Sequence, residues 1–358
     1  MPGCRVVRVA FTLEQCWHDV PGGTAVAALE LARALVETGE VDLFGVSARH
    51  RGLPADVQWR PPVPMRALPL PRLALYEAWL RFRRPAITGA DVVHATTVIV
   101  PPRRRVPLVV TVHDLAWRHD PEHFTGHGVR VFNRGLELIR DEADLVFCSS
   151  LATLRDCRAN GIEEARLRHV PLGVRVIEAT DDDVRRVRER YGIRGPYVFF
   201  SGTHEPRKNL RGLAAAFAAV KAQHRDLELI VSGPSGWGDT TPTGRTIGFV
   251  PSDDLRALHR GAEAFCYPSL WEGFGLPLLE AMAQGTRVVT SRGTSTEEIA
   301  EGVGVLVDPR DVDSIAAGLL EALSTETDGS AERRRAAEYT WYRTAQLTVA
   351  GYWDVVKT

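Results

Sequence analysis

Two glutamates, Glu272 and Glu280, stand on either side of the segment Gly-Phe-Gly-Leu-Pro-Leu-Leu. An apolar strand pattern precedes them from Phe265. A helical pattern begins near Pro277, where proline is tolerated because its missing N–H would have no partner in a first helical turn. The segment is therefore predicted to form a strand, a loop and a helix. Carboxylates accept hydrogen bonds from sugar hydroxyls, so the pair is suited to a polyhydroxylated ligand.

The predicted helix start between the two glutamates is a candidate anion site. Free N–H groups around Phe274, Gly275 and Leu276 would attract negative charge, and the glycines Gly273 and Gly275 let a phosphate come close. A ligand with hydroxyls at both ends and phosphates in its middle is a nucleotide diphosphate sugar. Taken singly, each glutamate would more often be a solvated residue, so the spacing alone indicates only an anion site.

A second group of chemically useful residues follows another predicted strand, at 197–201. The chain continues from Gly202 as Gly-Thr-His-Glu-Pro-Arg-Lys-Asn. In this turn Arg207 and Lys208 are suited to neutralise a diphosphate, because arginine can bind two oxygens at once. Asn209 is a natural N-cap for the alanine-rich helix that follows. Adjacent basic residues alone are more often simply solvated.

Both segments resemble the motifs of the family 4 retaining glycosyltransferases, of the glycosyl transferases group 1 type. The run from Glu272 to Glu280 is similar to the E-x7-E signature of that family, and the run from Gly202 to Asn209 is similar to its second motif. The resemblance extends over nearly the whole chain and is sharpest over 197–309. It implies an enzyme that moves a sugar from a nucleotide diphosphate donor with retention of anomeric configuration.

The resemblance also implies roles for single residues. Glu272 would hold the sugar hydroxyls and Glu280 the ribose, Arg207 and Lys208 would stabilise the leaving diphosphate, and the main chain near Val250 would meet the nucleobase. The complete set of implied donor contacts is Gly22, Gly23, Gly202, Arg207, Lys208, Val250, Glu272, Gly273, Phe274, Gly275, Leu276 and Glu280.

The first half of the sequence offers two further candidates. His113 follows a predicted strand at 108–112, at the edge where parallel sheets bind ligands. Its segment, Val-Thr-Val-His-Asp-Leu-Ala-Trp, resembles the part of the family's acceptor domain whose histidine lies over the donor sugar. Gly22 and Gly23 are predicted to lie in a loop before a helix, and such a glycine turn faces the donor phosphates in the family. A lone histidine or a glycine pair is more often structural.

Strands alternate with helices along the chain, which is typical of parallel α/β sheets. We predict two Rossmann-like domains that face each other across a cleft, the arrangement called GT-B in this family. Residues 1–175 are assigned to an acceptor-binding domain and 176–340 to a nucleotide-sugar-binding domain. The resemblance implies that a helix within 341–358 crosses back to pack on the first domain. The proline-rich stretch 50–71 is predicted to be a surface loop, and 247–250 a short strand.

Composition restricts the function further. A net charge of -1 argues against nucleic-acid binding. No apolar run approaches the roughly 20 residues that span a bilayer, and the first residues lack the apolar core of a signal peptide, so we expect a cytoplasmic protein. Five cysteines without a C-x-x-C pair are expected to be buried free thiols. We expect no metal or cofactor, because Asp181-Asp-Asp183 is better explained as a helix start than as a Mg²⁺ site.

Two segments, 72–84 and 103–105, combine arginines with nearby aromatic and aliphatic residues. A packed helix with a solvated end is the favoured interpretation. The alternative is peripheral contact with an anionic membrane at its inner face, or with a lipid-phosphate acceptor.

We therefore predict a retaining glycosyltransferase that moves a hexosyl group to a hydroxyl of a glycan, lipid-linked or small-molecule acceptor. The segment His-Asp-Leu-Ala-Trp is slightly closer to mannosyl-transferring relatives, so GDP-mannose is the first candidate donor and UDP-glucose or another UDP-sugar the second. The alternatives are an inactive GT-B scaffold, or another sugar-nucleotide enzyme such as an epimerase or a phosphorylase. A nicotinamide-dependent dehydrogenase is disfavoured, because no G-x-G-x-x-G fingerprint follows the first predicted strand.

Overall fold

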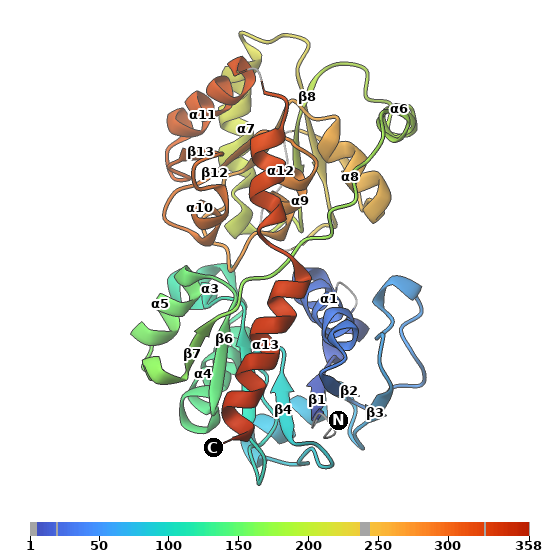
Figure 1. Cartoon of the computed structure of the whole chain (residues 1–358). Helices are drawn as coiled ribbons and strands as arrows, with labels where there is room; N and C mark the ends of the chain where they lie inside the picture. The colour runs from blue at the N-terminus through green and yellow to red at the C-terminus, as the bar shows by residue number, and fades with distance from the viewer. Residues whose placement is uncertain (1–5, 19–20, 237–243, 326, 358) are drawn as a thin grey trace. The chain divides into compact units, whose positions relative to one another are not determined.

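The structure is a computed structural model that describes residues 6–18, 21–236, 244–325 and 327–357 (Figure 1). The chain divides into two compact units. The first unit consists of Met1–Gly173 together with Trp341–Thr358, and the second of Val174–Thr340. The second unit is thus continuous in sequence, whereas the first is made of two segments.

The described residues of the first unit form a seven-stranded parallel sheet in the order β3-β2-β1-β4-β5-β6-β7. Its central strands are valine- and leucine-rich and buried on both faces, as expected of a parallel sheet covered by helices. The strands are β1 Val7–Thr12, β2 Val41–Ser47, β3 Met65–Ala67, β4 Val92–Ala95, β5 Leu108–Val112, β6 Leu145–Cys148 and β7 Leu167–His169.

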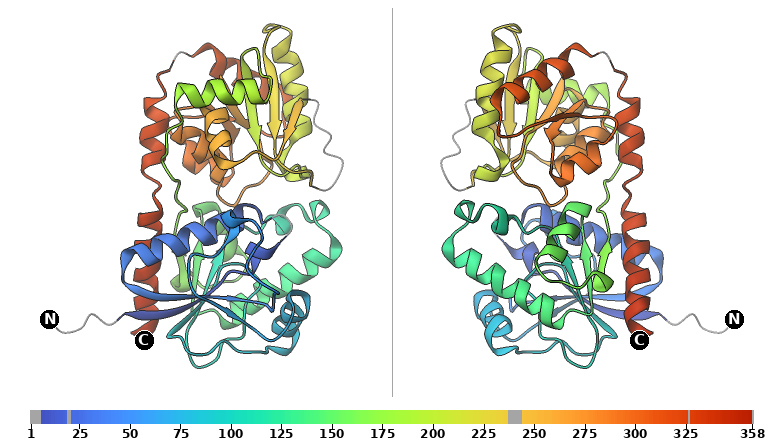
Figure 2. Two further views of the ribbon diagram at one scale, coloured as in Figure 1. Left: turned by 90° about the vertical axis from the view of Figure 1, so that its right-hand side faces the viewer. Right: turned by 90° about the vertical axis from the view of Figure 1, so that its left-hand side faces the viewer.

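Helices of the first unit connect and cover these strands. They are α1 Gly22–Thr38, α2 Arg72–Glu77, α3 Ala116–His119, α4 Gly126–Glu142, α5 Leu151–Ala159 and α13 Trp341–Val356. A π-helix, η3 Ala78–Phe82, continues α2, and short 3-10 helices are η1 Glu14–Trp17, η2 Val57–Trp59, η4 Pro121–His123 and η5 Glu164–Arg166. Helix α13 packs against α1 and β6 (Figures 1 and 2). A Cβ atom at Gly351 would lie 2.6 Å from Phe147 Cε1, so glycine permits this close approach.

The second unit has a six-stranded parallel sheet in its described residues, in the order β10-β9-β8-β11-β12-β13. The strands are β8 Tyr197–Ser201, β9 Glu228–Ser232, β10 Arg245–Gly248, β11 Ala264–Tyr267, β12 Val288–Ser291 and β13 Val305–Val307. The helices are α6 Asp181–Arg190, α7 Leu210–Lys221, α8 Ser252–Arg260, α9 Leu276–Ala283, α10 Ser295–Ala300, α11 Val312–Ser324 and α12 Ser330–Ala337, with the turn η6 Pro206–Lys208.

In both sheets the strand order reverses at the first strand of the unit. The first strand of each unit pairs with the second strand on one side and with the fourth on the other: β1 with β2 and β4, and β8 with β9 and β11. In open parallel sheets the crevice at such a switch point, at the carboxyl ends of the strands, is where ligands bind. The segments that follow β8 and β11 therefore lie where a ligand of the second unit is expected.

The strands predicted at 108–112 and 197–201 are confirmed as β5 and β8, and three other predictions are wrong in detail. The proline-rich stretch 50–71 contains β3, which pairs with β2 at the sheet edge, where prolines nearby are tolerated. Helix α1 begins at Gly22, so Gly22 and Gly23 lie in its first turn, and Gly22 enters it with φ 65°, a backbone conformation that glycine adopts readily. Strand β10 ends at Gly248, before Val250.

Several smaller predictions concern single side chains. Asp183 forms a capping box with Thr180 at the start of α6, which confirms the helix-start interpretation of the three aspartates. Four cysteines are buried free thiols, and Cys4 lies outside the described residues. In the described ranges, no group of three or more His, Cys, Asp or Glu side chains is arranged to hold a metal ion. No helix there combines the length and the apolar character needed to cross a bilayer.

Candidate active site

Glu272 lies in the loop between β11 and α9, and this loop is held by its neighbours in the second unit. The Ser295 hydroxyl donates to the carbonyl oxygens of Glu272 and Phe274 at 2.8 and 2.9 Å. Gly275 precedes α9 with φ 113°, a conformation that favours glycine. A Cβ atom on Gly275 would lie 2.7 Å from Thr296 Cγ2. The predicted strand, loop and helix are confirmed, and the helix begins one residue before Pro277.

Three residues from the two sequence motifs meet here. Lys208 Nζ lies 2.7 Å from Glu272 Oε1, and Arg207 Nη1 lies 3.0 Å from Glu272 Oε2. The pairing follows from the topology, because β8 leads into η6 with both cations, and β11, the neighbour of β8, leads to Glu272. The structure therefore brings Arg207, Lys208 and Glu272 into one charged group at the carboxyl edge of the second sheet.

Asn209 fixes the turn that carries the two cations. Its side-chain amide donates to the carbonyl oxygens of Pro268 and Pro309 at 3.1 and 2.6 Å. Its side-chain oxygen accepts from Gly212 N at 3.3 Å, so it is the N-cap of α7, as predicted. The residue has φ 55°, which asparagine tolerates better than most residues. One side chain thus joins the cation turn, the loop of Glu272 and the segment after β13.

The charged group is almost closed to solvent. Glu272 and Lys208 are 5% and 6% exposed. Burial alone would raise the pKa of the Glu272 carboxyl, but the charges of Lys208 and Arg207 outweigh it and hold the pKa at about 2. Glu272 is therefore ionised at any physiological pH.

Glu280 has a different environment, although it belongs to the same short segment. It lies on α9, is half-buried, and has no hydrogen-bond partner among the described residues. Burial raises the pKa of Glu280 to about 7, against the opposing charge of Arg256. The carboxylate is thus available to a ligand but only partly ionised at neutral pH.

Other predicted donor residues of the second unit lie at the same sheet edge or near it. Gly202 N donates to Ser232 O at 3.1 Å, and Gly233 packs so closely on Gly202 that a Cβ atom there would lie 1.9 Å from Gly202 O. Val250 is buried two residues after β10. Phe274 is buried, and Leu276 is the first residue of α9.

His113 follows β5 at the carboxyl edge of the first sheet. Its Nε2 lies 3.2 Å from Thr96 O, and because a carbonyl oxygen only accepts, this nitrogen carries the proton. The hydroxyls of Ser149 and Thr153 donate to His113 O at 2.8 and 2.9 Å. Burial lowers the pKa of His113, while Asp114 acts in the opposite direction. A neutral imidazole with Nδ1 as its acceptor follows.

Two residues of the charged group have no role in the sequence-based prediction. Glu205 Oε1 lies 2.6 Å from Arg207 Nη2, and the Tyr267 hydroxyl lies 2.5 Å from Lys208 Nζ. Glu205 stands inside the second motif, so its position two residues before Arg207 is a usable signal. Tyr267 is the last residue of an apolar strand and carries no signal in the sequence alone.

Comparison with known proteins agrees with this arrangement. Residues 183–341 match the family Glycosyl transferases group 1, and residues 21–178 match Glycosyltransferase Family 4. The O-antigen chain mannosyltransferase B of Escherichia coli is 32% identical over 274 residues, covering 70% of this chain and 71% of that protein. The D-inositol 3-phosphate glycosyltransferase of Kribbella flavida is 29% identical over 408 residues, covering 97% and 94%.

One further relative is much longer than this chain. The serotype-specific mannosyltransferase WbdA of Escherichia coli is 27% identical over 268 residues, which cover 68% of this chain but 33% of that protein. The chain thus spans about a third of the length of this relative.

Solved structures share the fold. Sucrose-phosphate synthase from Thermosynechococcus elongatus superposes with a TM-score of 0.76 at 20% identity, covering 98% of this chain and 99% of that chain. Anabaena Alr3699/HepE in complex with UDP and glucose gives 0.74 at 19% identity, covering 96% and 98%. WaaG, a glycosyltransferase involved in lipopolysaccharide biosynthesis, gives 0.69 at 16%, covering 95% and 98%.

Two parallel-sheet α/β units, one of them with a buried acid and two cations at its switch point, define a protein of the GT-B class. The chain belongs to the group 1 and family 4 glycosyltransferases, and it is a glycosyltransferase that uses a nucleotide sugar. The predicted family, fold class and enzyme class are confirmed, and retention of anomeric configuration fits this family.

Proposed function

We propose that the protein transfers a hexosyl group, in the first place mannosyl, from a nucleotide diphosphate sugar to a hydroxyl of a glycan, lipid-linked or small-molecule acceptor. The second unit binds the donor and the first unit binds the acceptor. The observation that carries this assignment is the meeting of Glu272 with Arg207 and Lys208 at the switch point of the second sheet.

The two cations stabilise the leaving diphosphate. As the bond between the anomeric carbon and the phosphate oxygen breaks, its electron pair stays with the diphosphate. The acceptor oxygen bonds to the anomeric carbon on the same face and gives its proton to the departing phosphate. Arg207 and Lys208, together with the start of α9 at Phe274, Gly275 and Leu276, are arranged before reaction to meet the growing negative charge, which typically removes several kcal/mol of barrier.

Three acidic or basic side chains orient the donor. Glu272 is ionised and accepts from the sugar hydroxyls while it keeps its pairs with the cations. Glu280, which has no partner among the described residues, accepts from the ribose hydroxyls. The imidazole of His113 contacts the sugar from the first unit. The glycines Gly22, Gly23, Gly202 and Gly273 leave room for the phosphates, and the main chain near Val250 meets the base.

The identity of the donor is proposed from the relatives. Escherichia coli relatives named mannosyltransferases favour GDP-mannose, and the Anabaena structure contains UDP and glucose, which keeps UDP-glucose as the second candidate. Thermal unfolding of the protein with GDP-, UDP- and dTDP-sugars separates these, because a ligand at about 100 times its dissociation constant adds roughly 2.7 kcal/mol. We expect GDP-mannose to raise the midpoint. A response to none of the donors, with cooperative melting, favours an inactive scaffold.

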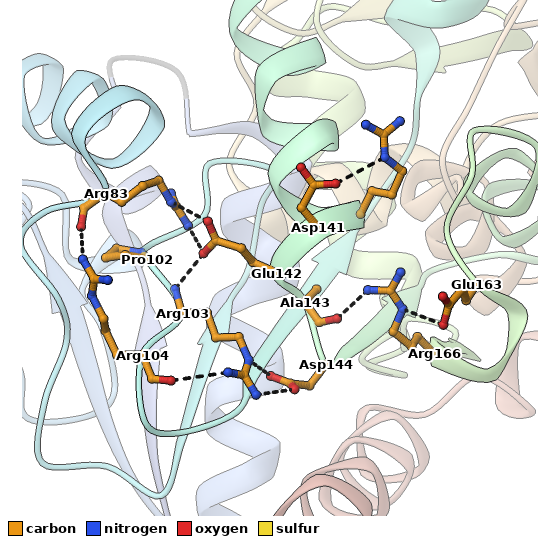
Figure 3. A pocket seen from close by; sticks show the side chains of 11 residues that line it. Arg83, Pro102, Arg103, Arg104, Asp141, Glu142, Ala143, Asp144, Glu163 and Arg166 are labelled. Carbon is orange, nitrogen blue, oxygen red and sulfur yellow. Dashed lines mark hydrogen bonds and ion pairs between the residues drawn. The ribbon is translucent and has the colours of Figure 1, made fainter.

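We also propose that the segments 72–84 and 103–105 contact an anionic membrane at its inner, cytoplasmic face. Phe82 is 69% exposed, and Arg105 is exposed without a partner in the part of the chain that the structure describes. Arg104 Nη2 donates to Arg83 O at 2.8 Å, which joins the two segments. They border a pocket of about 600 Å³ at the amino edge of the first sheet (Figure 3).

The arginines inside this pocket are largely paired, so the exposed rim would carry the contact. Arg83 binds Glu142, and Arg103 binds Asp144 (Figure 3). Phe82→Ser with Arg105→Ser should abolish co-sedimentation with phosphatidylglycerol liposomes at low salt. The matched pair Leu53→Ser with Arg51→Ser, also exposed in the first unit, should not. Absence of co-sedimentation by the unaltered protein would refute the contact.

A further inference from the structure

Three neighbouring groups of the second unit bind the guanidinium of Arg207. Its Nη2 lies 2.6 Å from Glu205 Oε1, and its Nη1 lies 3.0 Å from Glu272 Oε2 and 3.2 Å from Trp271 O. Its own carbonyl accepts from Leu270 N at 2.7 Å. A guanidinium is planar, so two carboxylates bound to its two terminal nitrogens fix both its position and its plane.

Glu205 is therefore more than a solvated acid beside a base. Its side chain is 7% exposed, and it immediately precedes the turn η6 that carries both cations. A buried carboxylate needs a partner, because an unpaired buried charge costs several kcal/mol. Arg207 supplies that partner, and Glu205 in return determines where the outer edge of the guanidinium points.

Lys208 is held in a comparable way by an aromatic stack. The Tyr267 hydroxyl lies 2.5 Å from Lys208 Nζ, and the same nitrogen lies 4.8 Å from the centre of the Tyr267 ring. The ring itself is completely buried and stacks with Phe200 and with Phe265, in each case with the ring centroids 5.6 Å apart. Since the ring has no room to move, its hydroxyl is a fixed hydrogen-bond partner for the ammonium.

The four charges of the group balance. Glu205 and Glu272 carry two negative charges, and Arg207 and Lys208 carry two positive ones. With Glu272 as the only acid, both cations would share one carboxylate, and Nη2 of Arg207 would lose the carboxylate that holds it while Nη1 kept its contacts with Glu272 and Trp271. Glu205 thus holds the second terminal nitrogen of the guanidinium and also keeps the closed site electrically neutral before a donor enters.

We propose that Glu205 and Tyr267 are positioning residues of the transfer reaction. Glu205 acts through Arg207 and Tyr267 acts through Lys208, and neither touches the donor. The inference rests on the proposed diphosphate role of the two cations. It assigns these two residues to the reacting geometry, because displacement of a catalytic group by about 1 Å can cost on the order of a hundredfold in rate.

The inference is tested by comparing kcat in single and double variants, in which the losses should not multiply. Glu205→Gln should lower kcat by about tenfold to a hundredfold with little change in the donor KM. In an Arg207→Ala background the same change should have no further effect, because there is no guanidinium left to position. Tyr267→Phe should behave in the same way relative to Lys208→Ala. Glu205→Asp, which keeps the charge with a shorter reach, should recover part of the loss.

Matched controls in the same unit separate positioning from folding. Asp254 is a buried carboxylate bound to Arg186 and Arg190, and the buried Tyr197 hydroxyl donates to Leu258 O at 2.7 Å. Asp254→Asn and Tyr197→Phe should lower the melting temperature but leave kcat unchanged. If Glu205→Gln is too unstable to assay, Glu205→Asp must show the reduced kcat with a near-native melting temperature.

The outcomes separate the inference from the proposed function on which it rests. A wild-type kcat in Glu205→Gln, or losses that multiply in the double variants, would overturn the positioning role while leaving the slow Arg207→Ala enzyme as support for the diphosphate role. A wild-type rate in Arg207→Ala and Lys208→Ala would instead remove the diphosphate role itself, and with it the inference.

Discussion

Glu272 and Glu280 are chemically identical side chains of one short segment, and the structure gives them opposite electrostatic settings. Glu272 is held ionised by two cations, with a pKa of about 2, whereas burial raises the pKa of Glu280 to about 7. Glu272 lies in a loop beside the turn after β8, which carries Arg207 and Lys208. Glu280 lies on α9, where the opposing charge is that of Arg256 on α8, and Arg256 forms no hydrogen bond to Glu280. A function that depends on Glu280 should therefore be sensitive to pH near neutrality.

Nucleotide-sugar affinity should report the ionisation of Glu280. Its raised pKa means that the carboxylate dominates above about pH 7 and the neutral acid below it, and an ionised acceptor makes the stronger hydrogen bond to ribose. We expect the dissociation constant of GDP-mannose to increase by up to about tenfold from pH 8 to pH 6. Calorimetry at several pH values measures this dissociation constant. A nucleotide sugar is chosen as the ligand because its diphosphate does not titrate in this range.

Substitution of Glu280 provides the control. Glu280→Gln keeps the size of the side chain and should bind the donor more weakly at pH 8, by roughly 1.5 to 3 kcal/mol if a charged hydrogen bond is lost. Its affinity should no longer vary between pH 6 and pH 8. An unchanged affinity in this variant would contradict the ribose role of Glu280.

At the scale of elements, the start of α9 depends on one glycine. Gly275 has φ 113°, and a Cβ atom there would lie 2.7 Å from Thr296 Cγ2 on α10. Both the backbone conformation and the packing of two helices thus require the absence of a side chain. The anion site and the loop of Glu272 are built on this position.

Gly275→Ala should destabilise the second unit through two separable costs. The backbone conformation costs about 1–2 kcal/mol in a non-glycine residue, and the contact with Thr296 adds roughly 1–3 kcal/mol. Gly293→Ala is the matched control, because Gly293 has φ 80° but a Cβ atom added to it would meet nothing within 4 Å. Urea unfolding should therefore give a larger loss for Gly275→Ala than for Gly293→Ala.

A second variant identifies the steric part. Thr296→Ser removes Cγ2 but keeps the hydroxyl, which contacts Thr290 and Thr294 at 2.8 Å. In this background Gly275→Ala should cost little more than Gly293→Ala. Equal losses for both glycine variants in the natural background would show that the contact with Thr296 is easily relieved.

The sequence predicts elements where local pattern decides them. Short apolar runs such as Leu108–Val112 predict buried parallel strands, and Asn209 predicts the start of a helix. The strand β3 has three residues, too few for a periodic pattern, and exists because the edge of β2 is available to pair. Helix α4 is amphipathic but polar on average and has glycines at its first and third positions, so its sequence gives a weak helical signal.

The candidate site, like the fold, is only partly predictable from the sequence. The motifs predict Glu272, Arg207 and Lys208 as functional residues, but their mutual ion pairs depend on β8 and β11 being neighbours. That strand order is a property of the whole sheet, which no local pattern in the sequence contains. The same reasoning explains why Tyr267 has no signal before the fold is known.

At the scale of the whole molecule, each unit buries a neutral histidine. His94 in the first unit contacts Tyr352 and Thr111, and His259 in the second packs on Phe199 and Phe265. Burial lowers the pKa of both imidazoles to about 3. Neither can take up a proton in the folded state at mildly acidic pH.

Stability should therefore fall as the pH decreases below about 6.5. An unfolded histidine binds a proton near pH 6.5 and these two bind one only near pH 3 when folded, so protons favour the unfolded chain between these values. Each histidine should cost about 2 kcal/mol at pH 5 relative to pH 8. Urea unfolding of the protein from pH 8 to pH 5 measures the slope.

The contribution of His259 to this pH dependence of stability can be tested by substitution. Both of its ring nitrogens lack a hydrogen-bond partner in the described part of the chain, so His259→Leu breaks no such bond. The variant should lose about 2 kcal/mol less than the natural protein between pH 8 and pH 5. An unaltered slope in His259→Leu would contradict the assignment.

The return of α13 to the first unit also has a consequence for recombination between genes. Because the second unit is an uninterrupted stretch from Val174 to Thr340, exchange of this stretch alone needs two crossovers. A single crossover near residue 174 would also import a foreign α13, whose residue at position 351 must fit against Phe147 of the resident sheet. Natural or engineered exchange of the second unit should therefore favour chimaeras in which the last helix keeps its original parent.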